Sequence, residues 1–193
     1  MPPKVKFTRE EMITAALEIT REKGIEAVTA RSLGERLGTS SRPIFTAFQN
    51  MEEVQREVIG AGKKRYNQYI QEGLAQPSAF KGVGTQYIKF ALGEPKLFQL
   101  LFMTEQAEVP DLKNVLPLID ENYRQILKSV QKDYGLEETA AESFYQQLWI
   151  FTHGIATLCA TKMCRFSSGE IGKMMAQVRE GLLKELKAGE KDD

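Results

Sequence analysis

The chain has 193 residues, of which 42% are hydrophobic and 27% are charged, the balance of an ordinary globular protein. This length allows a sizeable core and is the usual size for one small domain plus a larger helical domain. No stretch approaches the ~20 apolar residues that a membrane span needs, and the first four residues lack the apolar core of a secretion signal. We therefore expect a cytoplasmic protein with no membrane partner.

Cysteine and histidine are scarce. Cys159 and Cys164 are five residues apart in a stretch with helical periodicity, so their side chains should face different directions and form no disulfide. A single histidine, His153, is too few for ordinary metal-ligand spacing, and no Gly-rich phosphate loop is present. We expect no cofactor, no metal and no catalytic residues, and an all-helical enzyme built on ordinary carboxylates stays open as an alternative.

Charge is unevenly distributed along the chain, although the formal net charge is zero. Residues 1–68 carry 12 Lys and Arg against 9 Asp and Glu, a net charge of +3, which leaves −3 on the remainder. A basic front half followed by an acidic remainder is the asymmetry expected of a DNA-binding head on a body that should avoid DNA.

A short basic arm opens the chain. It consists of Lys4, Lys6 and Arg9, and it could reach phosphates or a minor groove, with a solvated tail as the alternative. The first predicted helix follows, capped by Thr8 and ended by Gly24, with a broad apolar face for the next two helices.

Residues 28–54 are interpreted as a short helix, a tight turn and a second short helix. Gly38 suits the end of the first of these, because a positive φ costs glycine nothing, and Thr39 or Ser40 can cap the second. Two helices joined by so few residues must cross steeply. That is the geometry of a helix-turn-helix, whose second helix can lie in a DNA major groove.

The second helix of this pair carries polar residues that should point away from Ile44 and Phe48. Pro43 falls in its first turn, where the missing N–H is not needed, and it is also expected to lie at the DNA-binding surface. Three residues are predicted to read base edges, namely Arg31, Ser41 and Arg42. Four are predicted to contact phosphates, namely Thr29, Ser40, Thr46 and Asn50, the last of which also caps the following helix.

Over these residues the chain resembles the tetracycline-repressor (TetR) family of bacterial transcription regulators. The elements that match the family pattern without gaps are Gly24, Val28-Thr29-Ala30-Arg31, Leu33 to Ser40, and Ile44 to Val54. The sequence departs from that pattern at Phe45, where Tyr is usual, at Met51, where Lys is usual, and at Ala47, where an aromatic residue or His is common. These departures remove phosphate contacts that the resemblance implies, although the Phe45 ring can still pack on the sugar-phosphate backbone.

A long amphipathic helix is predicted from Asn50 to about Gly73, after which Gln76-Pro77-Ser78 breaks the chain. Because this helix begins in the head and ends in the body, a shift of its far end would swing the recognition helix. The expected domains are a helix-turn-helix DNA-binding domain at 1–50, a linking helix at 51–75, and a helical ligand-binding and dimerisation domain at 76–193.

Two body segments resemble one ligand-domain subclass of the same family. Residues 87–102 resemble its Tyr-x-x-Phe-Ala-x-x-x-Pro-x-hydrophobic-Phe segment, and residues 149–154 have its Trp-x-x-x-His-Gly signature. The resemblance implies a pocket for a small apolar ligand, with ordinary core packing as the alternative for each residue. The candidate pocket residues are Tyr87, Phe90, Phe98, Leu101, Phe102, Tyr123, Phe144, Leu148, Phe151 and Thr152.

The last part of the chain predicts three helices, at about 109–134, at about 137–165, and after Gly169. The middle one is apolar on two adjacent stripes, so one stripe should pack inside the body and the other should meet a partner chain. The last helix has a matching apolar face. Together they suggest a homodimer whose seam is a four-helix arrangement of the last two helices of each protomer.

The sequence therefore predicts an all-α homodimer of about nine helices, with a helix-turn-helix head and a C-terminal helical bundle. The predicted function is that of a transcriptional repressor, released from a roughly palindromic operator when a small apolar ligand binds the body. The alternative within this fold is a constitutive or protein-controlled regulator with a filled core and no small-molecule ligand.

Overall fold

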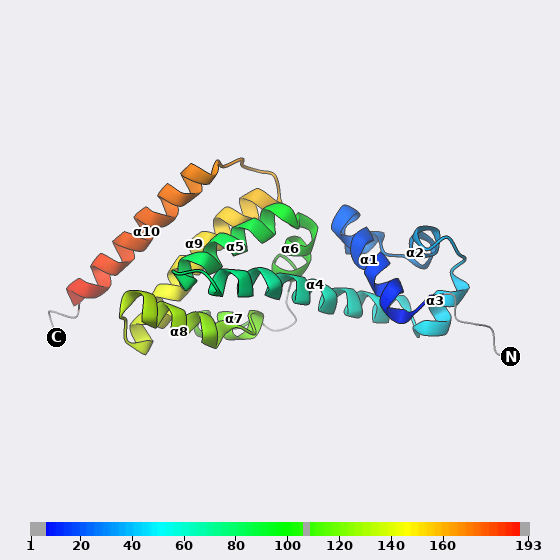
Figure 1. Cartoon of the computed structure of the whole chain (residues 1–193), viewed down its shortest axis with the longest axis horizontal. Coiled ribbons are helices and arrows are strands. Elements are labelled where there is room, and N and C mark those ends of the chain that lie inside the picture. Colours follow the sequence, from blue (N-terminus) through cyan, green and yellow to red (C-terminus); the bar gives the residue numbers. More distant parts are fainter. Residues whose placement is uncertain (1–6, 106–108, 190–193) are drawn as a thin grey trace. The chain divides into compact units, whose positions relative to one another are not determined.

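The computed structural model of the chain describes residues 7–105 and 109–189, and within these ranges it contains ten α-helices, one short 3-10 helix and no strand (Figure 1). The expected all-α class is confirmed, with one helix more than expected. The helices are α1 Arg9–Lys23, α2 Ala30–Arg36, α3 Arg42–Ala47, α4 Met51–Leu74, α5 Ala79–Gly93, α6 Pro95–Phe102, α7 Leu112–Ile119, α8 Tyr123–Tyr134, α9 Glu138–Ala160 and α10 Ser168–Gly189, and the 3-10 helix η1 is Ile25–Ala27.

The contacts divide the chain into two compact units. The head unit contains the described residues up to Tyr66 together with residues 94–104, and the body unit contains residues 67–93 and the described residues from 105 onward. This division differs from the expected 1–50, 51–75 and 76–193, because α4 contributes to both units and α6 belongs to the head unit. In α6, Leu97 comes so close to α4 that a Cβ on Gly62 would lie 3.6 Å from its side chain.

One apolar core holds the first four helices together, and Figure 1 shows α1, α2 and α3 gathered around the first part of α4. Each of the four supplies at least one fully buried side chain, among them Met12, Leu33, Ile44 and Val54, all with no exposed surface. The start of α1 is as expected, because Thr8 and Glu11 form a reciprocal capping box. Burial of these side chains fixes the crossing of α2 and α3.

The turn between α2 and α3 is tight. Gly38 has φ +63°, and the Thr39 N–H donates to the Gly34 carbonyl oxygen over 2.9 Å. The expected cap of α3 by Thr39 or Ser40 was wrong. Ser41 occupies the N-cap position without a side-chain cap, because its backbone is already helical at φ −70° and ψ −16°. Pro43 lies in the first turn of α3 as expected.

The predicted single helix at 109–134 was wrong, because residues 120–122 interrupt it between α7 and α8. Asp120 is extended, with φ −127° and ψ 109°, and its carboxylate accepts hydrogen bonds from the backbone N–H of Asn122, at 2.8 Å, and from its side-chain amide. Both residues are buried. Short polar side chains that bond to nearby backbone compete with helix formation, which explains the break.

The helix predicted to run to about Arg165 ends earlier, at Ala160. Lys162 adopts the left-handed conformation, with φ +58°, and the N–H of Met163 donates to the Leu158 carbonyl oxygen. This is the hydrogen bonding of a Schellman motif, which ends a helix by satisfying its last carbonyl groups. The cysteines are free thiols, Cys159 buried in α9 and Cys164 exposed beyond its end.

In the body unit, α5, α8 and α9 pack on one another, and α10 packs on α9. The end of α4 crosses α5 so closely that a Cβ on Gly82 would overlap the carbonyl oxygen of Gly73. An aromatic cluster fills the space beside this crossing, where the Phe80 ring lies 5.8 Å from Phe144 and 5.5 Å from Tyr145. The residues around this crossing therefore pack tightly.

Candidate nucleic-acid interface and regulatory body

The outward side of α3 is the centre of the candidate interface. Ile44 and Phe48 are buried against the head core, with 0% and 2% of their surface exposed, so the opposite side of this short helix faces solvent. The exposed side chains there are Ser41, Arg42, Phe45 and Thr46. Ser40 in the turn is exposed as well, and Pro43 is half-buried.

Arg42 is the cation best placed on this surface. Within residues 7–105 and 109–189 it has no ion-pair partner. Arg31, in the first turn of α2, is 89% exposed and pairs with Glu35 over 2.9 Å, which raises the pKa of the arginine. An exposed pair of this kind contributes little stability, so Arg31 can exchange Glu35 for a guanine edge or a phosphate at small cost.

Two of the predicted phosphate contacts also cap helices. The Thr29 hydroxyl oxygen accepts a hydrogen bond from the backbone N–H of Ser32 at the start of α2. The side-chain oxygen of Asn50 accepts one from the backbone N–H of Glu53 over 2.8 Å, as expected for the cap of α4. The amide NH2 of Asn50 is then the group with which it could donate to a phosphate.

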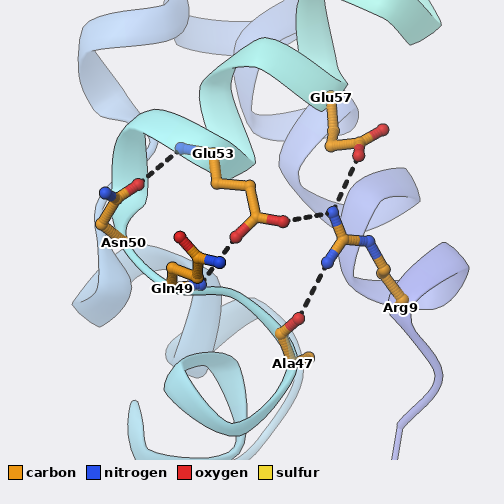
Figure 2. A network of polar contacts seen from close by, with 6 residues as sticks. All are labelled: Arg9, Ala47, Gln49, Asn50, Glu53 and Glu57. Atoms are coloured by element: carbon orange, nitrogen blue, oxygen red, sulfur yellow. Dashed lines mark hydrogen bonds and ion pairs between the residues drawn. The ribbon is translucent and has the colours of Figure 1, made fainter.

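Arg9 belongs to the head rather than to a basic arm, which corrects the expectation for this residue. Figure 2 shows its guanidinium between α4 and the end of α3, where it donates to the Ala47 carbonyl oxygen over 2.8 Å. It also pairs with Glu53 at 2.6 Å and Glu57 at 2.8 Å, and it lies 4.2 Å from the centroid of the Phe48 ring. Arg9 lies in the head because it is the first residue of α1, from where the Arg9 side chain extends toward α4. Lys4 and Lys6 lie outside the described residues.

This network has electrostatic consequences. The hydrogen bonds that Arg9 donates to the carboxylates of Glu57 and Glu53 raise the pKa of Arg9. The backbone N–H of Gln49 and the Arg9 guanidinium lower the pKa of Glu53, so its carboxylate stays charged. Sequence reasoning missed this role. The available signal was the pair Glu53 and Glu57, which are four residues apart and therefore share one side of α4.

A second polar centre in the head unit was also missed. Glu94, at the junction of α5 and α6, is 3% exposed and accepts two hydrogen bonds from Arg21 of α1, at 2.6 and 2.8 Å. Arg65 of α4 donates to the same carboxylate over 3.3 Å. A buried carboxylate held by two arginines thus connects α1, α4 and the start of α6.

The candidate pocket residues are distributed over both units. Seven belong to the body unit, and the three on α6, Phe98, Leu101 and Phe102, belong to the head unit. In the body unit, the Thr152 hydroxyl donates to the Leu148 carbonyl oxygen over 2.7 Å, and Phe151 packs on the cluster of Ile88, Ile155 and Cys159. The remaining members are placed as follows: Tyr87, Phe90 and Phe144 are buried, and Tyr123 is half-buried.

The Trp-x-x-x-His-Gly segment lies on α9, where Trp149 and His153 are one turn apart and their rings stack at 5.2 Å. The Tyr87 hydroxyl of α5 lies 2.9 Å from Nδ1 of His153. Burial lowers the pKa of His153 and raises that of Tyr87, so both groups are neutral near pH 7. Beyond His153, a Cβ on Gly154 would meet open space.

No helix within residues 7–105 and 109–189 is long and apolar enough to span a bilayer. No group of three or more His, Cys, Asp or Glu side chains in those same segments is arranged to hold a metal ion.

Two protein-family models match the chain. The model described as "Bacterial regulatory proteins, tetR family" matches residues 12–58, which include α2, the turn and α3. The model described as "Tetracyclin repressor-like, C-terminal domain" matches residues 80–177, about half of the chain. No curated protein matches it. Neither match tests the resemblance to the Trp-x-x-x-His-Gly subclass or the roles of individual residues, which stay predictions.

Proposed function

From the premise that the chain belongs to the tetR family of bacterial regulatory proteins, we propose that this DNA-binding transcription regulator is a repressor released by a small apolar ligand. The observation that carries the proposal is the outward side of α3, where Arg42 is exposed and unpaired within the described ranges. A helix with one buried side and one polar, cationic side is suited to the major groove.

In the proposed complex α3 lies in the major groove. Arg31, Ser41 and Arg42 contact base edges, with Arg42 and Arg31 able to donate to the N7 and O6 atoms of guanine. The phosphate contacts are Thr29, Ser40, Thr46 and Asn50. The Arg9 network supports this arrangement, because it ties the end of α3 to α1 and α4 and so fixes the orientation of the recognition helix.

We propose that the homodimer forms through α9 and α10, as dimerisation is implied by the family. The outward surface of α9 supports this seam, because Ile150 is 49% exposed and Gly154 leaves room for a neighbouring helix. In α10, Ile171, Met174 and Met175 pack against α9. Two heads related by a two-fold axis would require a roughly palindromic operator, with half-sites about one helical turn apart or somewhat more.

The proposed switch is a competition between two dimer shapes, one favoured by ligand and the other by operator. By linkage, bound ligand then weakens operator binding, and bound operator weakens ligand binding by the same factor. One feature supports coupling of the units: α4 is one continuous helix whose first part belongs to the head unit and whose end belongs to the body unit.

The first experiment is selection of bound sequences from a random duplex pool, followed by titration of the enriched duplex at several salt concentrations. We expect a palindrome whose affinity falls steeply with salt, because phosphate contacts release counterions. An Arg42→Ala variant taken through the same selection is the matched control. Failure to enrich any sequence with the intact dimer contradicts operator binding.

The second experiment tests the ligand. Apolar compounds are screened for those that raise the melting temperature by the amount expected from mass action, and their effect on operator affinity is then measured. A compound that binds without changing operator affinity rules out release by that ligand. If no compound binds, the constitutive or protein-controlled alternative is favoured.

A further inference from the structure

An exposed aromatic ring stands out on the interface surface. Phe45 lies in the middle of α3 and has 51% of its surface exposed. Within the described ranges it is not among the side chains packed on the head core, whereas Ala47 and Met51 are. The ring therefore contributes little to folding of the head in the free protein, and its location suggests a role in the complex.

Phe45 shares its side of α3 with Arg42. The two residues are three positions apart, so their side chains are neighbours on the helix surface. Thr46, next to Phe45, donates its hydroxyl hydrogen to the Arg42 carbonyl oxygen over 3.2 Å. Because the Thr46 hydroxyl is hydrogen-bonded to the helix backbone, this side of α3 presents the Arg42 guanidinium group and, next to it, mostly apolar atoms.

A phenyl ring offers no hydrogen bond to a phosphate, and the negative face of its π system does not attract an anion. Its binding energy must come from burying apolar surface. In the major groove the distinctive apolar group on a base edge is the C5-methyl group of thymine. Phe45 should therefore gain more from a base edge than from the sugar-phosphate backbone.

We propose that Phe45 is a specificity-determining residue that recognises thymine through its 5-methyl group, beside the base pair contacted by Arg42. The inference rests on the proposed placement of α3 in the major groove. Residues three apart in a helix are about 4.5 Å apart along its axis, far enough for their side chains to reach two adjacent base pairs, which are stacked about 3.4 Å apart. Burial of one methyl group corresponds to about a fourfold change in affinity per half-site.

The test uses the enriched operator and replaces the thymines of one half-site, one at a time, by deoxyuridine, which lacks only the methyl group. Dissociation constants are measured for the full-length protein and for Phe45→Ala and Phe45→Leu. We expect one position at which deoxyuridine weakens binding of the unmodified protein about fourfold and has no effect on Phe45→Ala. Phe45→Leu, which keeps an apolar side chain, should retain part of the discrimination.

The other thymines of the half-site are internal controls, and unchanged circular dichroism shows that the variants fold. If every deoxyuridine substitution has the same effect on the unmodified protein and on Phe45→Ala, Phe45 does not read a methyl group and the inference is overturned, while operator binding stands. If the unmodified protein enriches no operator at all, both the proposed function and this inference are overturned.

Discussion

Replacement of Glu94 by Gln should destabilise the head unit, because it removes the charge held between Arg21 and Arg65. The substitution preserves the shape of the side chain, so the lost interactions are the charge-assisted hydrogen bonds at 2.6, 2.8 and 3.3 Å. The new amide NH2 would also direct a donor toward guanidinium groups that themselves only donate.

The magnitude follows from burial. Removing one partner of a fully buried ion pair costs about 3–5 kcal/mol. Here Glu94 is 3% exposed, but the two arginine side chains are each 43% exposed and can regain water when the carboxylate is lost. We therefore expect a loss of about 2–3 kcal/mol, nearer the value for hydrogen bonds to charged groups. For a protein of this size that corresponds to a fall in Tm of about 4–12 °C.

The assay is thermal unfolding at a fixed protein concentration, because dimerisation makes Tm depend on concentration. Glu180→Gln is the matched control, since Glu180 is 72% exposed and lies 3.5 Å from its partner Arg179. This exposed substitution should change stability by no more than about 0.5 kcal/mol. If Glu94→Gln proves as mild as the control, Glu94 is not held as a buried ion pair and the reasoning is refuted.

Three further predictions concern other parts of the chain. Arg42→Ala should cost about 1–3 kcal/mol of operator binding at one base position, measured by titrating operator variants, and a uniform loss over all sequences would instead assign Arg42 to a phosphate. Gly82→Ala should destabilise the protein by about 1–3 kcal/mol in thermal or urea unfolding, because the added methyl group overlaps the Gly73 carbonyl oxygen. Gly84→Ala is its control and should be neutral or stabilising, because the nearest atom to the added methyl group is 3.9 Å away. Burial lowers the pKa of His153 below its ordinary 6.5, so the unfolded chain binds the proton more readily and the free energy of unfolding should decrease as the pH drops through about 6.5. The decrease in Tm between pH 7.5 and pH 5.5 should therefore be smaller for His153→Gln than for the unmodified protein, and equal decreases would contradict the prediction.

Much of the head could be predicted from sequence because its signals are local. The cap of α1 by Thr8, the positive φ of Gly38 and the cap of α4 by Asn50 each depend on residues within one helical turn. The amphipathic spacing that buries Ile44 is equally local. Because these interactions join residues close together in the chain, the sequence pattern alone is enough to predict where the helices begin and end.

Residues 120–122 show where local patterns are insufficient. The apolar spacing continues through them, so it predicted one helix where there are two. The break between α7 and α8 is decided by the burial of Asp120 and Asn122, because buried polar groups need hydrogen-bond partners. The Asn122 side chain donates to Asn67 and accepts from Gln71, both of α4. That requirement exists only once α4 and α8 have come together.

The sequence by itself determined the helical class, the helix-turn-helix and the positions of most helix ends. Only the tertiary structure decided that Arg9 is tied to Glu53 and Glu57, that Glu94 is held by Arg21 and Arg65, and that α6 belongs to the head unit. The physical reason is the distance along the chain. Partners separated by 29 to 73 residues leave no periodic trace in the sequence, and they meet only when buried apolar surfaces bring their helices together.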